Sequence, residues 1–141
     1  MKNSSTTILI DKEISMEKVT QLLARLMMGQ IFLIAGLQKI GGYEGTQGYM
    51  ESAGVPGMLL PLVILVEAGG GLALIIGWQT KLVAMVLALF TLAAAVLFHN
   101  NVADQMQMIM FMKNIAISGG LMLLAVYGAG GYSVDSHRNK R

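Results

Sequence analysis

The strongest constraint on the fold is a long apolar run, GMLLPLVILVEAGGGLALIIG, from Gly57 to Gly77. A helix needs about 20 apolar residues to cross the ~30 Å hydrocarbon core of a bilayer, and this run has that length. Glu67 is its single charged residue and lies at its midpoint. A carboxylate at this depth is costly unless it faces a protein interior and has a basic partner. The run therefore predicts a membrane span that carries a polar site.

Three further apolar segments indicate that the chain crosses the membrane four times. They are Val19–Ile40, Leu82–Phe98 and Gln105–Tyr127. The composition agrees, because 55% of the 141 residues are hydrophobic and only 13% are charged, against about 25% charged in a typical soluble domain. The expected fold is all-α, a transmembrane four-helix bundle.

The polar segments define the remaining organisation. Residues 1–15 are expected to form a disordered leader, residues 16–135 the four-span membrane domain, and residues 136–141 a basic tail. The connection between the first two spans is long, and its segment Thr46–Ala53 is expected to form a short helix at the membrane interface.

Basic residues outside the spans predict the orientation. With four crossings both termini lie on one side, and most basic residues outside the spans lie there: Lys2, Lys12, Lys18, Lys81, Arg138, Lys140 and Arg141. The opposite side has only Lys39, at its boundary. Because Lys and Arg are enriched in cytoplasmic loops, both termini are expected in the cytoplasm.

An intramembrane polar cluster is the candidate functional site. We expect Glu67 to lie between Arg25 of the first span and Lys113 of the fourth, with Asn114 beside Lys113, because charges in lipid pair with each other or with backbone carbonyls. We expect Lys39 to extend its side chain to the nearest membrane surface, and the same extension is the alternative for Arg25. Such a cluster could also be purely structural.

Glycines on the charged faces predict close helix packing, because small residues let membrane helices approach one another. The packing candidates are Gly29, Gly36, Gly70, Gly71 and Gly120.

Several kinds of chemistry are not expected from this chain alone. Cysteine is absent, which excludes thiol catalysis, disulfides and iron–sulfur ligation. The two histidines, His99 in a turn and His137 in the tail, are poorly placed for a bis-histidine haem, and no metal site is expected. The net charge of +2 comes mainly from the termini, which suits an anionic lipid surface better than nucleic acid. Catalysis by the chain alone is not expected.

Three stretches of the sequence resemble the DoxX family of small four-span bacterial membrane proteins. They are LLARLMMGQIFLIAGLQKIGG (Leu22–Gly42), GVPGMLLPLVILVEAGGGLALIIGWQTK (Gly54–Lys81) and GAGGYSVD (Gly128–Asp135). The family's motif positions correspond here to Arg25, Gly36, Lys39, Glu67, Gly70, Gly71, Gly130, Tyr132 and Asp135. The resemblance implies a four-helix bundle in the bacterial inner membrane with both ends cytoplasmic.

Three functions remain open from the sequence. The resemblance implies a link to redox chemistry, because some relatives are linked to quinone-coupled thiosulfate oxidation and others to assemblies with superoxide dismutase. The leading hypothesis is therefore a membrane anchor or subunit that docks a soluble oxidoreductase on its cytoplasmic side, or holds a quinone near Glu67, without an intrinsic cofactor. The alternatives are a small proton-coupled transporter that uses Glu67, and a non-catalytic assembly or stress protein. A homodimer is a further candidate assembly.

Overall fold

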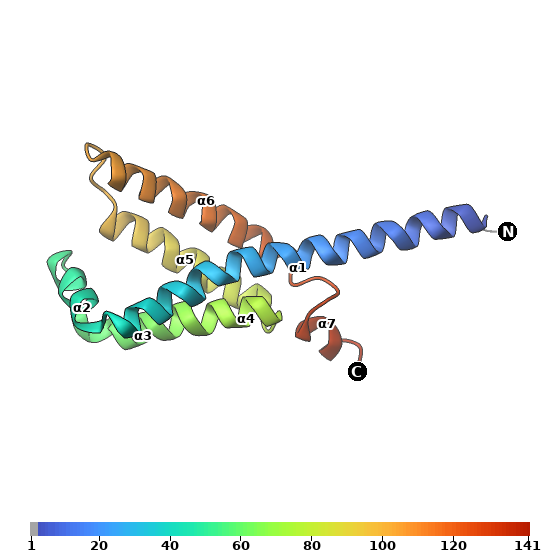
Figure 1. The fold of residues 1–141 in the computed structure, drawn as a ribbon, viewed down its shortest axis with the longest axis horizontal. Helices are drawn as coiled ribbons and strands as arrows, with labels where there is room; N and C mark the ends of the chain where they lie inside the picture. The colour runs from blue at the N-terminus through green and yellow to red at the C-terminus, as the bar shows by residue number, and fades with distance from the viewer. Residues whose placement is uncertain (1–2) are drawn as a thin grey trace.

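The computed structural model describes residues 3–141, and every regular element within that range is helical (Figure 1). The elements are α1 (Ser4–Gly41), α2 (Tyr43–Ser52), the 3-10 turn η1 (Gly57–Leu59), α3 (Leu60–Ile64), the π-helical turn η2 (Leu65–Gly69), α4 (Gly70–Ile76), α5 (Thr80–Phe98), α6 (Gln105–Tyr127) and α7 (Val134–Arg138). Four helical segments are long and apolar enough to cross a membrane: Ser4–Gly41, Gly57–Ile76, Thr80–Phe98 and Gln105–Tyr127. The predicted all-α four-span fold is confirmed.

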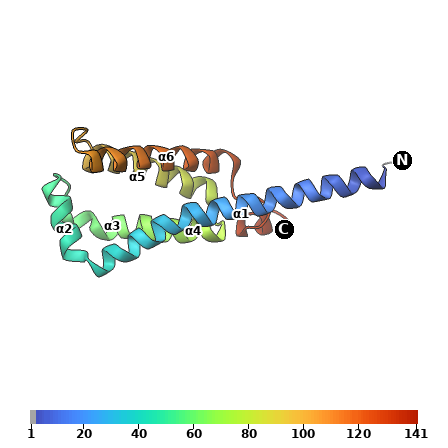
Figure 2. The same ribbon diagram turned by 45° about the horizontal axis from the view of Figure 1, so that its top comes forward.

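The first helix is longer than expected. It begins at Ser4 and projects well beyond the other helices (Figures 1 and 2), so residues 4–15 are helical where a disordered leader was expected. No glycine or proline interrupts the chain before Gly29, and a helix already nucleated in the span extends at little cost. The first two residues of that expected leader lie outside the described residues.

The second span is not a uniform α-helix. It passes from a 3-10 turn through α3 to the π-helical turn η2 and then to α4. A π-helical turn contains an extra residue, which rotates the side chains that follow it, and such turns are frequent at functional sites. Glu67 lies inside η2. The span ends at Gly77, whose φ of 74° is the left-handed conformation that glycine adopts without strain.

The spans pack as two helix pairs. The second span lies along α1, and α5 lies along α6. Figures 1 and 2 show that the pairs meet at the turn between α4 and α5 and diverge toward α2. Phe32, Leu74, Leu87 and Leu121 are buried in the core between them.

The short helix α2 covers the end of the bundle where the two pairs diverge. It spans Tyr43–Ser52, which confirms a helix close to the expected Thr46–Ala53. The Tyr49 ring stacks on Phe98 at the end of α5, with 5.5 Å between ring centroids. This contact links the connection between the first two spans to the second helix pair.

All five glycines for which close packing was expected lie against a neighbouring helix. A Cβ atom on Gly29 would lie 2.7 Å from the carbonyl oxygen of Gly71, and one on Gly36 would lie 2.8 Å from the Ala68 Cβ. The other contacts are Gly70 with Leu87 and Gly120 with Met28. Gly29, Gly36 and Gly71 thus allow the backbones of α1 and the second span to touch.

Candidate functional site

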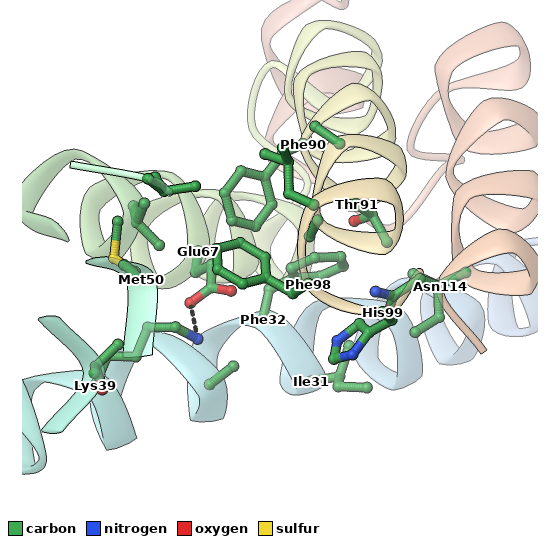
Figure 3. A pocket seen from close by; sticks show the side chains of 18 of the residues that line it. Ile31, Phe32, Lys39, Met50, Glu67, Phe90, Thr91, Phe98, His99 and Asn114 are labelled. Atoms are coloured by element: carbon green, nitrogen blue, oxygen red, sulfur yellow. Dashed lines mark ion pairs between the residues drawn. The ribbon is translucent and has the colours of Figure 1, made fainter. Parts of the chain in front are cut away.

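Glu67 pairs with Lys39 and not with Arg25. The Lys39 Nζ atom lies 2.8 Å from the Glu67 Oε2 atom (Figure 3). This pair is the one salt bridge among residues 3–141. Glu67 is buried, with 7% of its surface exposed. The structure therefore differs from the expected sandwich between Arg25 and Lys113, and from the expectation that Lys39 extends to the membrane surface.

Helix register explains this pairing. Because α1 and the second span are antiparallel, residues late in α1 face residues early in the second span. The contact of Gly36 with Ala68 brings Lys39 beside Glu67. Arg25 lies about 21 Å away from Lys39 along α1, at a rise of about 1.5 Å per residue.

A cavity of about 360 Å³ lies beside the ion pair, between the two helix pairs and next to α2. Glu67 and Lys39 line one side, and His99 and Asn114 line the side formed by α5 and α6 (Figure 3). Lys113, which precedes Asn114 in α6, also lines the cavity. The remaining lining is largely apolar and includes Phe32, Phe90, Phe98, Tyr49 and Ile117. The structure thus brings Lys113 and Asn114 to the same cavity as Glu67, although Lys113 forms no ion pair with it.

His99 has a defined partner at the edge of this cavity. Its Nδ1 atom lies 2.9 Å from the Gln107 Oε1 atom, which joins the end of α5 to the first turns of α6. Since the Gln107 side-chain oxygen can only accept, His99 donates through Nδ1, and its Nε2 atom is left as an acceptor when the ring is neutral. The sequence indicated a turn at His99 but not this contact.

Arg25 belongs to a second, separate group of contacts at the opposite end of the bundle. Its guanidinium group is fully buried and donates to the carbonyl oxygens of Leu74 and Ile75, each at 3.3 Å, and to that of Tyr132. The last carbonyls of a helix have no partner within it, and a cation there is favourable. Arg25 therefore caps α4 and ties the C-terminal segment to α1.

The C-terminal segment also caps α5. The Asp135 carboxylate accepts from the backbone N–H of Gln79 at 2.8 Å and of Thr80 at 2.9 Å, and the Asp135 N–H donates to the Gly77 carbonyl. We call the contacts that Arg25 and Asp135 make with the turn between α4 and α5 and with Tyr132 the C-terminal clamp. The motif positions Tyr132 and Asp135 thus serve this clamp in the structure, and not the cavity beside Glu67.

Gly130, the remaining motif position in this segment, allows the chain to approach α1. Its φ is +81°, and a Cβ atom there would lie 2.7 Å from the Gln21 Cδ atom. A side chain would therefore be strained and would also collide with α1. The run GAGGYSVD carried this signal, because clustered glycines commonly mark tight backbone approaches.

We expect acid to weaken the C-terminal clamp. Burial acts to raise the pKa of Asp135. The hydrogen bonds from the backbone and side chain of Thr80, the backbone hydrogen bond from Gln79 and the positive charge of Arg138 outweigh burial and hold that pKa below the ordinary aspartate value of 3.8. The ionised carboxylate therefore contributes stability that is fully present above pH 3.8, the pKa of an unperturbed aspartate. That stability is lost as the pH falls through the folded-state pKa. Thermal unfolding of the detergent-solubilised protein should show this loss of stability below pH 3.8. The Asp135→Asn variant should be less stable at neutral pH and should not show this acid-dependent loss. Identical acid profiles would contradict the role of the carboxylate.

These features define the class of the protein: a small four-span α-helical membrane protein with an ion pair and a cavity inside its bundle. The DoxX family model matches residues 20–100, more than half of the chain, and the chain belongs to the DoxX family. The matched range includes Arg25, Lys39 and Glu67.

The curated relatives include membrane proteins of similar length. The chain is 53% identical over 126 residues to the inner membrane protein YqjF of Escherichia coli (strain K12). This match covers 89% of this chain and 97% of the relative. It is 36% identical over 124 residues to the inner membrane protein YphA of the same strain, covering 83% and 89%. It is also 32% identical over 79 residues, 56% of this chain and 59% of the relative, to a Bacillus subtilis (strain 168) protein named "Putative oxidoreductase CatD". No solved structure gives a significant match.

Proposed function

We propose that this protein holds a small amphipathic, lipophilic molecule of the quinone class beside Glu67, as the membrane subunit of a redox-linked complex in the bacterial inner membrane. The observation that carries the proposal is the cavity of about 360 Å³, which combines apolar and aromatic walls with polar groups on two facing sides. Small-molecule sites have this character, with volumes of about 300–1,000 Å³ and a few polar groups that orient the ligand.

The polar groups suit a flat ring with an oxygen at each end. Quinone oxygens accept hydrogen bonds, and residues with donor groups line both sides of the cavity: Lys39 on one side, and Lys113 and Asn114 on the other. The aromatic side chains Phe32 and Phe98 supply flat apolar surface near the ring. Each end of the ring would then meet a donor from a different helix pair.

A lipophilic tail has a route out of the cavity. The lining residues Ile31 and Leu97 are also exposed on the outside of the bundle, at 38% and 49%. In a membrane this outer surface faces acyl chains. A ligand could therefore keep its ring beside Glu67 while its tail lies in the bilayer.

Because the chain has no cysteine, it supplies neither a redox-active thiol nor an iron–sulfur ligand, and in this proposal the soluble partner brings the electron carrier. The relative named as an oxidoreductase supports the redox link. With both termini in the cytoplasm, the basic residues 136–141 would face a soluble oxidoreductase there. Glu67 and Lys39 would then orient the ring and supply or accept its proton.

A cavity-filling substitution tests the ligand site. Ala94 lines the cavity, so the Ala94→Phe variant should lower the affinity for a short-tailed quinone by at least about tenfold, because the added ring occupies the site. The measurement is equilibrium binding of the quinone to the purified protein in a mild detergent.

The matched control is Ala116→Phe, since Ala116 is exposed on α6 and does not line the cavity. It should bind quinone as the unsubstituted protein does. Equal affinities for the two variants, or no saturable binding by the unsubstituted protein, would contradict the proposal. Proton-linked flux in proteoliposomes without quinone binding would instead support the transporter hypothesis.

A further inference from the structure

A second cavity, of about 590 Å³, lies at the other end of the bundle, where α5 begins and α6 ends. We propose that it binds the phosphate group of an anionic phospholipid. Three basic side chains line it, Lys81 from α5 and Arg138 and Lys140 from the C-terminal segment. We call this the basic cavity. It shares no lining residue with the cavity beside Glu67.

The charge of the basic cavity is positive, and the one acidic residue in its lining neutralises only part of it. Lys81, Arg138 and Lys140 have no carboxylate within salt-bridge distance in the part of the chain that the structure describes. Asp135 is the one acidic residue in the lining, and both of its oxygens accept backbone hydrogen bonds from Gln79 and Thr80. Three positive charges and one negative charge leave a net charge of +2 for an incoming anion.

The first turn of α5 adds neutral donors to this site. The first N–H groups of a helix have no carbonyl partner within it, and Asp135 accepts only from those of Gln79 and Thr80. The N–H groups of Lys81 and Leu82 follow at the start of this 19-residue helix, and both residues line the cavity. Backbone donors, the helix dipole and cations together favour a phosphate.

The position of the basic cavity favours a lipid over a free phosphate. Its lining comes from the ends of two candidate membrane spans, so it lies where the headgroups of a bilayer begin. Leu82 and Tyr127 line it and are exposed at 64% and 76%. A phosphate held by Lys81 would thus have apolar surface beside it for acyl chains. Basic cavities between spans are a recurring way to bind anionic lipid headgroups.

The test compares lipids on the purified full-length protein. Phosphatidylglycerol is titrated against phosphatidylcholine in mixed micelles, and bound lipid is counted by native mass spectrometry. The unsubstituted protein should retain phosphatidylglycerol in preference to phosphatidylcholine. A Lys81→Gln/Arg138→Gln variant should bind phosphatidylglycerol about tenfold more weakly, because two of the three cations are gone. The charge-conserving Lys81→Arg/Arg138→Lys variant should retain most of the binding.

A control with the same loss of net charge separates this site from general attraction to anionic lipid. The Lys12→Gln/Arg141→Gln variant removes two charges that do not line the cavity, and it should bind phosphatidylglycerol as the unsubstituted protein does. If the cavity variant fails to fold, the exposed Lys140→Gln substitution gives the same comparison with a smaller expected loss. Equal weakening by the cavity and control variants would overturn the proposal. Displacement of the lipid by millimolar inorganic phosphate would overturn its assignment to a lipid.

Discussion

Replacing Arg25 by alanine should destabilise the protein by roughly 3 kcal/mol, since a buried cation that donates to three carbonyl groups is lost and a void remains. The carbonyls of Leu74, Ile75 and Tyr132 would lose this donor. The C-terminal segment would also lose its contact with α1. Unfolding by heat or denaturant in detergent measures the change.

Two controls define what this result means. Gln30 is exposed on the same helix, and the Gln30→Ala variant should unfold close to the unsubstituted protein. Because Arg25 is distant from Lys39, the folded fraction of the Arg25→Ala variant should bind quinone with unchanged affinity. An unfolding curve matching that of Gln30→Ala would refute the clamp, whereas a loss of quinone affinity alone would support a direct link between Arg25 and Glu67.

The Gly71→Ala substitution should have the second-largest effect, a destabilisation of about 1–3 kcal/mol from overpacking. A Cβ atom at this position would lie 2.7 Å from the Gly29 carbonyl oxygen and 3.0 Å from the Leu33 Cα atom. Both neighbours are backbone atoms, which cannot rotate away as a side chain could. Relief therefore requires α1 and α4 to separate.

Gly119 provides the matched control for this substitution. It lies on α6, and a Cβ atom there would meet nothing within 4 Å. The Gly119→Ala variant should be neutral or more stable by up to about 1 kcal/mol, because alanine favours the helix. Equal thermal stability of the two alanine variants would show that the contact between α1 and α4 does not depend on Gly71.

The partner of Glu67 could not be predicted from spacing along single helices. Periodicity indicates which residues share a face of one helix, but the pairing of charges depends on how far two helices slide along each other. The contact of Gly36 with Ala68 and the π-helical turn at Leu65–Gly69 decide that register here. Neither is visible in hydropathy. Hydropathy placed Lys39 at the boundary of the first span, and without the helix register its pairing with Glu67 could not be predicted.

The C-terminal clamp was missed because its contacts are distant in sequence. Asp135 caps a helix that begins at Thr80, and Arg25 donates to Tyr132. The glycines in the run GAGGYSVD indicated an irregular backbone, but not the helix ends that it would meet. The same long-range folding brings Lys81 together with Arg138 in the basic cavity.

The sequence by itself determined that this is an all-helical, four-span membrane protein. A span must be long and apolar enough to cross the hydrocarbon core, and in lipid a single span must form its backbone hydrogen bonds within a helix. It also singled out Glu67, because a carboxylate at membrane depth is costly wherever the helix packs. Only the tertiary structure decided that Lys39 neutralises Glu67, that Arg25 serves a separate clamp, and where the two cavities lie. Those outcomes depend on helix register and on contacts between distant segments, which no local pattern encodes.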